Sequence, residues 1–384
     1  MEPLPRRLLP VDVLLEIAAR SDDATTIVRL AAASKPLRRG ILDPAFPRCL
    51  ANVAAAKGRR IPVVATASYR IETYFLAPCT IETSRPALIR LFDTSLLLPF
   101  QPVCSRDGLL VLADPVGFSF RVCNTFTGRV THVSPPDSDR GVRRAYCPAL
   151  ITVDDGAVQF ELLVLHSDWR AQTFSSRADT WSAARGVKPP LGRAPPLTTS
   201  DAYLIAPVVI GRTVHWLCNA GHRFARDEEI IILSLHADTA QASSVIKLPP
   251  TNYFRASRNP FRSLILTATA DGRLGVVLAG HLEITMWTLM APGEGSTSSS
   301  ASWNLHLVID RQLTAGLLPH TDVRFEWFGE RTGTVLLVMD GVGLVQMDLR
   351  TKEVFVLHGM TPRVTRACLH EIDIVSFLDE MKRF

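Results

Sequence analysis

Apolar residues along this chain follow two different periods, and the change falls near residue 60. Before that point they recur three and four residues apart, as in Leu14, Ile17 and Ala18, which is the spacing of one helix face. After it, short runs alternate apolar with polar residues and stop at Gly, Asp or Pro, as strands joined by turns do. The sequence therefore predicts an α+β multidomain protein: a small all-α domain over residues 1–58 and an all-β domain over residues 59–384.

The all-α region divides into four short helices. Pro10 suits a helix start because its missing N–H needs no partner there. Further starts are predicted by the capping residues Asp22 or Asp23, Ser34 and Asp43, and the fourth helix is expected to stop at Lys57-Gly58. Helices this short are marginal alone in water. They must pack on one another, on the next domain as a cap, or on a partner.

The β region contains many short strand patterns with little helical pattern between them. Antiparallel sheets are therefore expected, because parallel strands need helical crossovers. At the end of the chain, apolar spacing over residues 372–381 predicts a short C-terminal helix. The clearest strand patterns are Leu109–Ala113, Phe118–Asn124, Phe160–Leu165, Val208–Leu217, Ile230–Leu235, Leu264–Thr269, Leu274–Leu278, Ile284–Leu289, Val335–Met339, Leu344–Leu349 and Val354–Leu357.

An internal repeat links the two ends of the β region. Asn124 and Asp348 each end a strand pattern, and each is followed three residues later by Thr and three further on by Val. Asx side chains stabilise turns by hydrogen bonding to the backbone two residues on. Looser copies lie between them at intervals of roughly 50–60 residues, a spacing near that of propeller blades. The β region is thus predicted to be a β-propeller of about six blades, seven also fitting; a pair of β-sandwiches is the alternative.

Composition allows a large core, and charge is placed unevenly. Apolar residues make up 47% of the chain and charged residues 21%, which argues against global disorder. The net charge of +5 lies within residues 1–60, where eleven Lys and Arg face six Asp and Glu, and the rest of the chain is balanced. A neutral β body is unlike a nucleic-acid-binding domain, which carries a basic face. A basic head suits an acidic protein partner, although an ordinary solvated helix surface explains it equally well.

The seven cysteines are odd in number and scattered, which is typical of reduced thiols in the cytosol or nucleus. No apolar run approaches the ~20 residues that a membrane span needs. We therefore expect a cytoplasmic or nuclear protein that binds neither membrane nor nucleic acid.

No residue pattern indicates catalysis. His215, Cys218 and His222 could suggest a metal site, but a fourth ligand is missing, and residues 215 and 218 point to opposite faces of a strand. Gly341 and Gly343 lack the third glycine of a dinucleotide site. The expectation is a protein that is not an enzyme and has no cofactor and no metal. Distant residues that converge in the fold leave a propeller hydrolase, such as a lactonase or glycosidase, as a less favoured alternative.

The helical region carries an ordered set of residues: Leu9-Pro10, Asp12, Leu14, Glu16-Ile17, Ile27–Leu30, Ala33-Ser34-Lys35, Leu37-Arg38, Asp43-Pro44 and Phe46. In order and spacing this set resembles an F-box. F-box proteins bind Skp1 and through it a cullin, so the resemblance implies the substrate adaptor of an SCF-type E3 ubiquitin ligase. The Skp1-binding residues that it implies are Leu9, Pro10, Val13, Leu14, Ile17, Ile27, Leu30, Ser34, Lys35 and Leu37.

The β region in turn resembles the F-box-associated, kelch-like domains of large plant families, which indicates a grass as the source. The matching segments include Asp107–Leu110 and Gly211–Leu217. This resemblance implies that the propeller binds an unknown target protein for ubiquitination. Ser21 and Pro36 depart from the F-box pattern and leave open a second hypothesis, an interaction scaffold whose Skp1 binding is weakened or lost.

Overall fold

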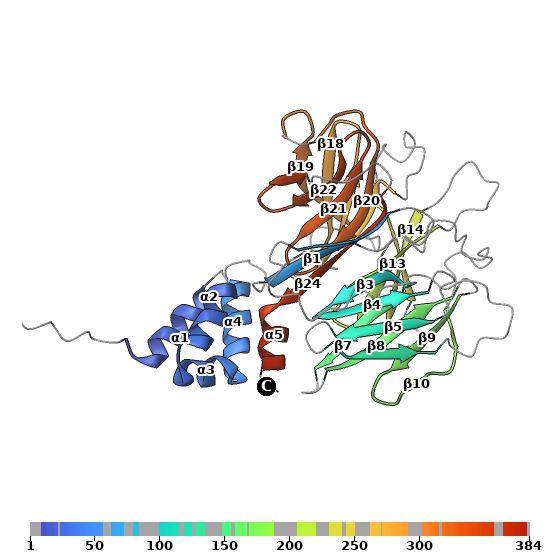
Figure 1. Ribbon diagram of the computed structural model, residues 1–384. Helices are drawn as coiled ribbons and strands as arrows, with labels where there is room; N and C mark the ends of the chain where they lie inside the picture. Colours follow the sequence, from blue (N-terminus) through green and yellow to red (C-terminus); the bar gives the residue numbers. More distant parts are fainter. Residues whose placement is uncertain are drawn as a thin grey trace, which may run out of the picture.

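A computed structural model describes most of the chain, and helices precede strands in it, as predicted (Figure 1). The described residues are 9–21, 24–56, 63–72, 80–83, 100–114, 119–124, 128–134, 148–154, 158–166, 169–187, 206–219, 230–239, 243–249, 262–269, 271–290, 302–314, 317–356 and 364–381.

Four helices form a compact head: α1 (Val11–Arg20), α2 (Ala24–Ala33), α3 (Lys35–Leu42) and α4 (Ala45–Ala56). Side chains cap two of them where the sequence predicts. The Ser34 hydroxyl accepts the N–H of Leu37 at 3.3 Å, and the Asp43 carboxylate accepts the N–H of Ala45 at 2.8 Å. Each oxygen satisfies an N–H that has no partner in the first helical turn. The alternative caps of the second helix, residues 22 and 23, lie outside the described residues.

The strands form antiparallel sheets around a ring, which confirms the propeller (Figure 1). Five sheets among the described residues have four or more strands, and we number them as blades I to V. Blade I contains β3 (Gln101–Arg106), β4 (Leu109–Ala113), β5 (Phe120–Asn124) and β6 (Val130–Val133); blade II contains β7 (Ala149–Asp154), β8 (Val158–Leu165), β9 (Arg170–Ser175), β10 (Thr180–Trp181) and β11 (Arg185–Gly186). Blade III contains β12 (Val208–Ile210), β13 (Thr213–Asn219), β14 (Ile230–His236) and β15 (Ser243–Lys247). Blade IV contains β16 (Leu264–Ala268), β17 (Leu274–Ala279), β18 (Glu283–Leu289) and β19 (Trp303–Asp310); blade V contains β20 (Val323–Phe328), β21 (Thr334–Met339), β22 (Gly343–Asp348) and β23 (Val354–Val356).

A three-stranded sheet joins the two ends of the β region. Its strand order is β2 (Thr80–Thr83), β1 (Val63–Glu72) and β24 (Val364–Asp373). The first strand of each blade contacts the first strand of the next, and β24 contacts both β20 of blade V and β3 of blade I. This closing sheet therefore completes the ring by pairing strands from opposite ends of the chain.

The blade count is corrected from about six to five, because the sheet at the remaining place in the ring has three described strands. One strand prediction also needs correction. Val208–Leu217 is not a single strand but two, β12 and β13, which are joined by a tight turn at Gly211 and Arg212. Gly211 has a φ of +59°, which glycine adopts without steric cost. The chain reverses there, although the apolar pattern reads as continuous.

The predicted repeat is confirmed at the level of hydrogen bonds. In blade I, the Asn124 N–H donates to Arg129 O at 2.9 Å, and Asn124 O accepts the N–H of Gly128 at 2.9 Å. In blade V, Asp348 makes both bonds with the residues at matching positions, Glu353 at 3.0 Å and Lys352 at 2.9 Å. The residue with positive φ is Gly128 in one turn and Lys352 in the other.

Tryptophans tie outer strands of neighbouring blades together. The indole N–H of Trp181, in blade II, donates to Ser134 O beside blade I at 2.8 Å. The indole N–H of Trp303, in blade IV, donates to Lys247 O of blade III at 2.8 Å. Trp169, Trp216 and Trp327 are buried. A large ring whose N–H is hydrogen bonded across the boundary, as in Trp181 and Trp303, stabilises the contact between blades.

The head packs against the propeller through the C-terminal helix. As predicted, a short helix, α5 (Ile374–Met381), follows β24, and Figure 1 shows it between the head and the strands. Ile374 and Leu378 are fully buried in one apolar cluster with Ile27 and Ile41 of the head. The helix also contacts α3 and β1. The head and the propeller therefore share a continuous core.

The described cysteines form no disulfide, and four of the five are buried. Burial raises the pKa of Cys123 to about 11, so its thiol stays protonated and unreactive at neutral pH. None of the described helices has the length and apolar character needed to cross a membrane.

Replacement of Leu378 by Ala should lower the free energy of unfolding by about 2–5 kcal/mol, because it opens a cavity in the core shared by head and propeller. Leu313→Ala is the matched control, since Leu313 is exposed, and should change stability by less than about 0.5 kcal/mol. Urea unfolding followed by tryptophan fluorescence measures both. Equal midpoints for the two variants would show that α5 does not join the core.

Candidate functional site

An apolar strip faces solvent on the head. It consists of Leu9, Pro10, Val11, Val13 and Ile17, with Leu9 55% and Ile17 50% exposed. Pro10 begins α1, where its carbonyl accepts the N–H of Leu14 at 3.2 Å. Contiguous exposed apolar residues of this kind mark interaction sites in soluble proteins.

The inner side of α1 has smaller residues. Ala18 and Ala19 are buried, and Leu15 packs tightly on Gly40 of α3. A Cβ at position 40 would lie 2.5 Å from the Leu15 Cδ1 atom, so glycine allows the two helices to approach closely. The head therefore buries small residues of α1 and leaves larger ones outside.

The structure separates the ten predicted partner-binding residues into three groups. Leu9, Pro10, Val13, Ile17 and Lys35 are exposed, while Leu14, Leu30 and Ser34 are partly buried. Ile27 is fully buried, and Leu37 is buried with it in the interior of the head. The prediction that these ten residues bind a partner stays a prediction. Val11 is also exposed but is not among the ten predicted residues. Its position three residues before Leu14, which is helical spacing, was the signal that could have included it.

Basic residues are exposed on the same head. Glu16 and Arg20 form an ion pair of 2.6 Å one turn apart on α1. The other exposed bases are Arg29, Lys35, Arg38, Arg39 and Arg48. A positive field of this kind accelerates the approach of an acidic partner.

A polar network connects most of the ring where the first strands of the blades end. Asp107, after β3, is paired with Arg331 of blade V and accepts the Thr152 hydroxyl of blade II at 2.7 Å. Arg106 reaches Glu330 of blade V at 3.2 Å. The same guanidinium donates to Val209 O of blade III at 3.1 Å. Burial alone would raise the pKa of Asp107, but Arg331 and Arg106 outweigh it and hold that pKa below its usual value.

Glu371 and His370 bring β24 into this network. Glu371 accepts the backbone N–H groups of Arg331 at 2.8 Å and Thr332 at 2.9 Å. Burial raises the pKa of Glu371 and lowers that of His370 to about 4, and His370 is hydrogen bonded to Ser105 at 2.5 Å. Titratable groups with shifted pKa values can indicate a catalytic site, but structural ion-pair networks shift pKa values in the same way. These side chains are engaged with one another, so the arrangement serves ring closure.

Two of the three residues considered as metal ligands, His215 and Cys218, lie in the described part of the chain, and both are buried. His215 is buried and shares a hydrogen bond of 2.7 Å with Ser234. Cys218 belongs to the core between blades II and III, and His222 lies outside the described residues. Within the described residues, no group of three His, Cys, Asp or Glu side chains could hold a metal ion.

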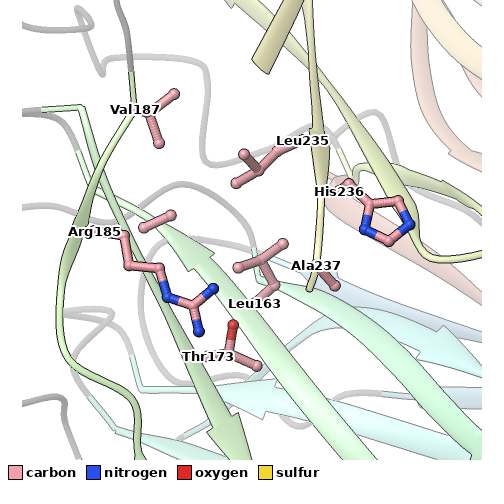
Figure 2. A pocket seen from close by; sticks show the side chains of 8 residues that line it. Leu163, Thr173, Arg185, Val187, Leu235, His236 and Ala237 are labelled. Atoms are coloured by element: carbon pink, nitrogen blue, oxygen red, sulfur yellow. The ribbon is translucent and has the colours of Figure 1, made fainter. Parts of the chain in front are cut away.

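A shallow recess with a volume of about 10 Å³ lies between blades II and III (Figure 2). Arg185 and His236 stand at its edge, and the remaining lining residues are Leu163, Ala171, Thr173, Val187, Leu235 and Ala237. Ligand pockets usually enclose about 300–1,000 Å³. The recess is therefore too small to be a convincing substrate site.

These features define the class: a β-propeller protein with a helical head, whose clearest candidate site is the apolar strip. The chain belongs to the family described as Domain of unknown function (DUF7595), whose profile matches residues 66–384. The match covers the propeller and begins after the head. No F-box or kelch family profile matches, and no curated protein matches the chain.

Several solved structures are similar at low identity. A protein in the crystal structure of a nidogen/laminin complex has 14% identity and a TM-score of 0.37, over 79% of this chain and 98% of that one. A DUF4784 family protein from Bacteroides caccae has 12% identity and a TM-score of 0.42, over 79% and 73%. Puromycin hydrolase has 17% identity and a TM-score of 0.38, over 67% of this chain and 37% of that enzyme. At these scores the similarities contribute nothing to the functional argument.

Stability should fall at acid pH partly because of His215. Burial lowers its pKa from 6.5 to about 4, so between these values the unfolded chain binds a proton that the folded one does not. Stability therefore rises with pH from about 4 to 6.5. His215→Asn should remove about 3 kcal/mol of this pH-dependent difference, as measured by urea unfolding at pH 7.5 and 4.5. His306→Asn, at an exposed position, is the control; equal pH dependence in the two variants would contradict the assignment to His215.

Proposed function

We propose that the protein is a non-catalytic substrate adaptor of an SCF-type ubiquitin ligase. Its head docks on a Skp1-like protein, through which it joins a cullin, and its propeller holds a target protein in the cytosol or nucleus. The single observation that carries the proposal is the exposure of Leu9, Val13 and Ile17 on a head that otherwise buries its apolar residues.

The arrangement of the head supports docking rather than capping. A cap on the propeller would turn its largest apolar residues toward the strands. Instead, α1 turns Ala18 and Ala19 inward, and the propeller-facing contacts come from other helices through α5. Covering a side chain such as Ile17 with a partner contributes about 1.5–3 kcal/mol, so a few such residues supply much of a specific interaction.

The two departures from the F-box pattern have local structural roles. Ser21 ends α1, where its N–H donates to Ala18 O at 3.1 Å. Pro36 lies in the first turn of α3, where a missing N–H costs nothing. Neither residue belongs to the apolar strip. These placements favour the adaptor over the scaffold that has lost Skp1 binding.

We also infer that the propeller is kelch-like and that the closing sheet completes its ring. Its strand β24 takes the same place in the ring as the first strand of each blade. The plant origin belongs to the same proposal and is based on the sequence resemblance alone.

The test is co-expression of the full chain with a grass Skp1-like protein. The pair should co-purify, and the double variant Leu9→Ser with Ile17→Ser should reduce the recovered complex at least tenfold, because two apolar contacts are lost. Val245→Ser, an exposed apolar position in blade III, should leave recovery unchanged.

Two results would remove the adaptor proposal. One is a wild-type chain that folds but recovers no Skp1-like protein. The other is a strip variant that recovers as much as the Val245→Ser control. Circular dichroism of each purified variant distinguishes loss of binding from loss of folding.

A further inference from the structure

Blade IV presents three exposed leucines on the loops at one end of its strands. Leu282 lies in the turn between β17 and β18, and Leu313 and Leu318 lie in the segment that leads from β19 to β20. Leu313 is 85% exposed, the largest value for a large apolar side chain among the described residues, and the other two are 45% exposed. We refer to these three residues as the leucine patch.

A buried arginine holds the two loops together. Arg311 is 1% exposed, and its guanidinium donates to the carbonyls of Gly280 at 2.6 Å and His281 at 3.2 Å. From the same side chain, Nη2 donates to the Thr321 carbonyl at 3.0 Å and to the Leu318 carbonyl. These bonds link the Leu282 turn to the loop that carries Leu318, so the leucine patch is one surface.

The loop itself is fixed with its leucines outward. The Asp310 carboxylate accepts the N–H groups of Gln312 at 2.8 Å and Leu313 at 3.3 Å. Leu317 turns inward and is buried, whereas its neighbour Leu318 turns outward. A preordered surface loses little conformational entropy when a partner binds, which favours affinity.

Acidic side chains surround the leucines. Asp310, Asp322 and Asp340 are all exposed. The N–H of Asp340 donates to the Asp322 carbonyl at 3.2 Å, so blade V contributes to the same region. The two arginines nearby in sequence are engaged: Arg311 binds carbonyls, and Arg324 is paired with Glu326. The exposed charge around the leucine patch is therefore negative.

We propose that the leucine patch is a docking surface for a protein segment that combines apolar side chains with Lys or Arg, as on one face of a basic amphipathic helix. Apolar residues of the segment would cover the leucines, and its bases would face the three aspartates. A second copy of this chain fits poorly, because self-association would bring aspartate against aspartate. The patch is remote from the head, since Figure 1 separates β18 and β19 widely from α1–α4.

The proposal deepens the proposed function and rests on it only in assuming that the propeller binds a protein. It is tested with a phage library of random 16-residue peptides selected on the full chain. We expect the enriched peptides to combine Leu, Ile or Phe with Lys or Arg. Measured by fluorescence anisotropy, the double variant Leu313→Ser with Leu318→Ser should bind an enriched peptide about tenfold more weakly, which corresponds to about 1.4 kcal/mol.

The charge requirement and the location are tested separately. The double variant Asp322→Asn with Asp340→Asn should weaken binding and reduce its salt dependence. Val245→Ser, on another blade, and the head variant Leu9→Ser with Ile17→Ser should bind the peptide as the wild type does. The head variant thus distinguishes failure of this proposal from failure of Skp1 docking.

Three outcomes would overturn the proposal: no enrichment, enrichment of acidic peptides, or equal peptide binding by the leucine variant and the Val245→Ser control. A fourth is a dimer of the wild-type chain in light scattering that the leucine variant converts to a monomer. That result would assign the leucine patch to self-association.

Discussion

The antiparallel pairing of β1 with β24 is the constraint on which the rest of the structure depends. It runs from Val63 opposite Asp373 to Glu72 opposite Val364 and joins residues about 300 positions apart. Among the described strands, every other pairing joins strands that are neighbours in sequence or, for β9 and β11, separated by one strand. Of the described pairings, the one between β1 and β24 is therefore the one that requires closure of a long loop. Because α4 ends shortly before β1 and α5 begins directly after β24, the same pairing brings the head and the C-terminal helix together. The position of the apolar strip is therefore set by ring closure and not by the helices alone.

The buried charges in this protein support the loops and the ring closure. Asp107, Arg331 and Glu371 link the ends of first strands to the closing sheet, and Arg311 holds the loops of blade IV. A buried charge is costly unless it is paired or hydrogen bonded, and each of these has several partners. A general acid or base in this network would need a carboxylate oxygen or imidazole nitrogen that can reach a substrate. Within the described part of the chain, the groups named here are instead turned toward one another and hold the ring closed.

Much of the fold could be predicted from the sequence because its signals are local. The apolar run Leu109–Ala113 matches β4 residue for residue, and the Ser34 and Asp43 caps begin α3 and α4. The predictions that failed depended on the pairing of distant strands or on backbone conformation. The apolar run from Val208 concealed the reversal at Gly211, and the closing sheet draws on both ends of the chain. In the candidate site, the family resemblance pointed to Leu9, Val13 and Ile17, which are exposed, and also to Ile27 and Leu37, which are buried. Helical periodicity alone does not say which side of a helix faces the core.

Together the two proposals assign the protein two apolar surfaces at separate places on one rigid body. The head cannot move freely, because Ile374 and Leu378 of α5 share its core, and the leucine patch cannot move freely, because Arg311 ties its loops to blade IV. The head as a whole carries an excess of exposed bases, whereas exposed aspartates lie near the leucines. This difference in charge disfavours exchange of partners between the two surfaces. An adaptor built in this way would hold two different proteins at a fixed separation, and that geometry raises the effective concentration of one near the other.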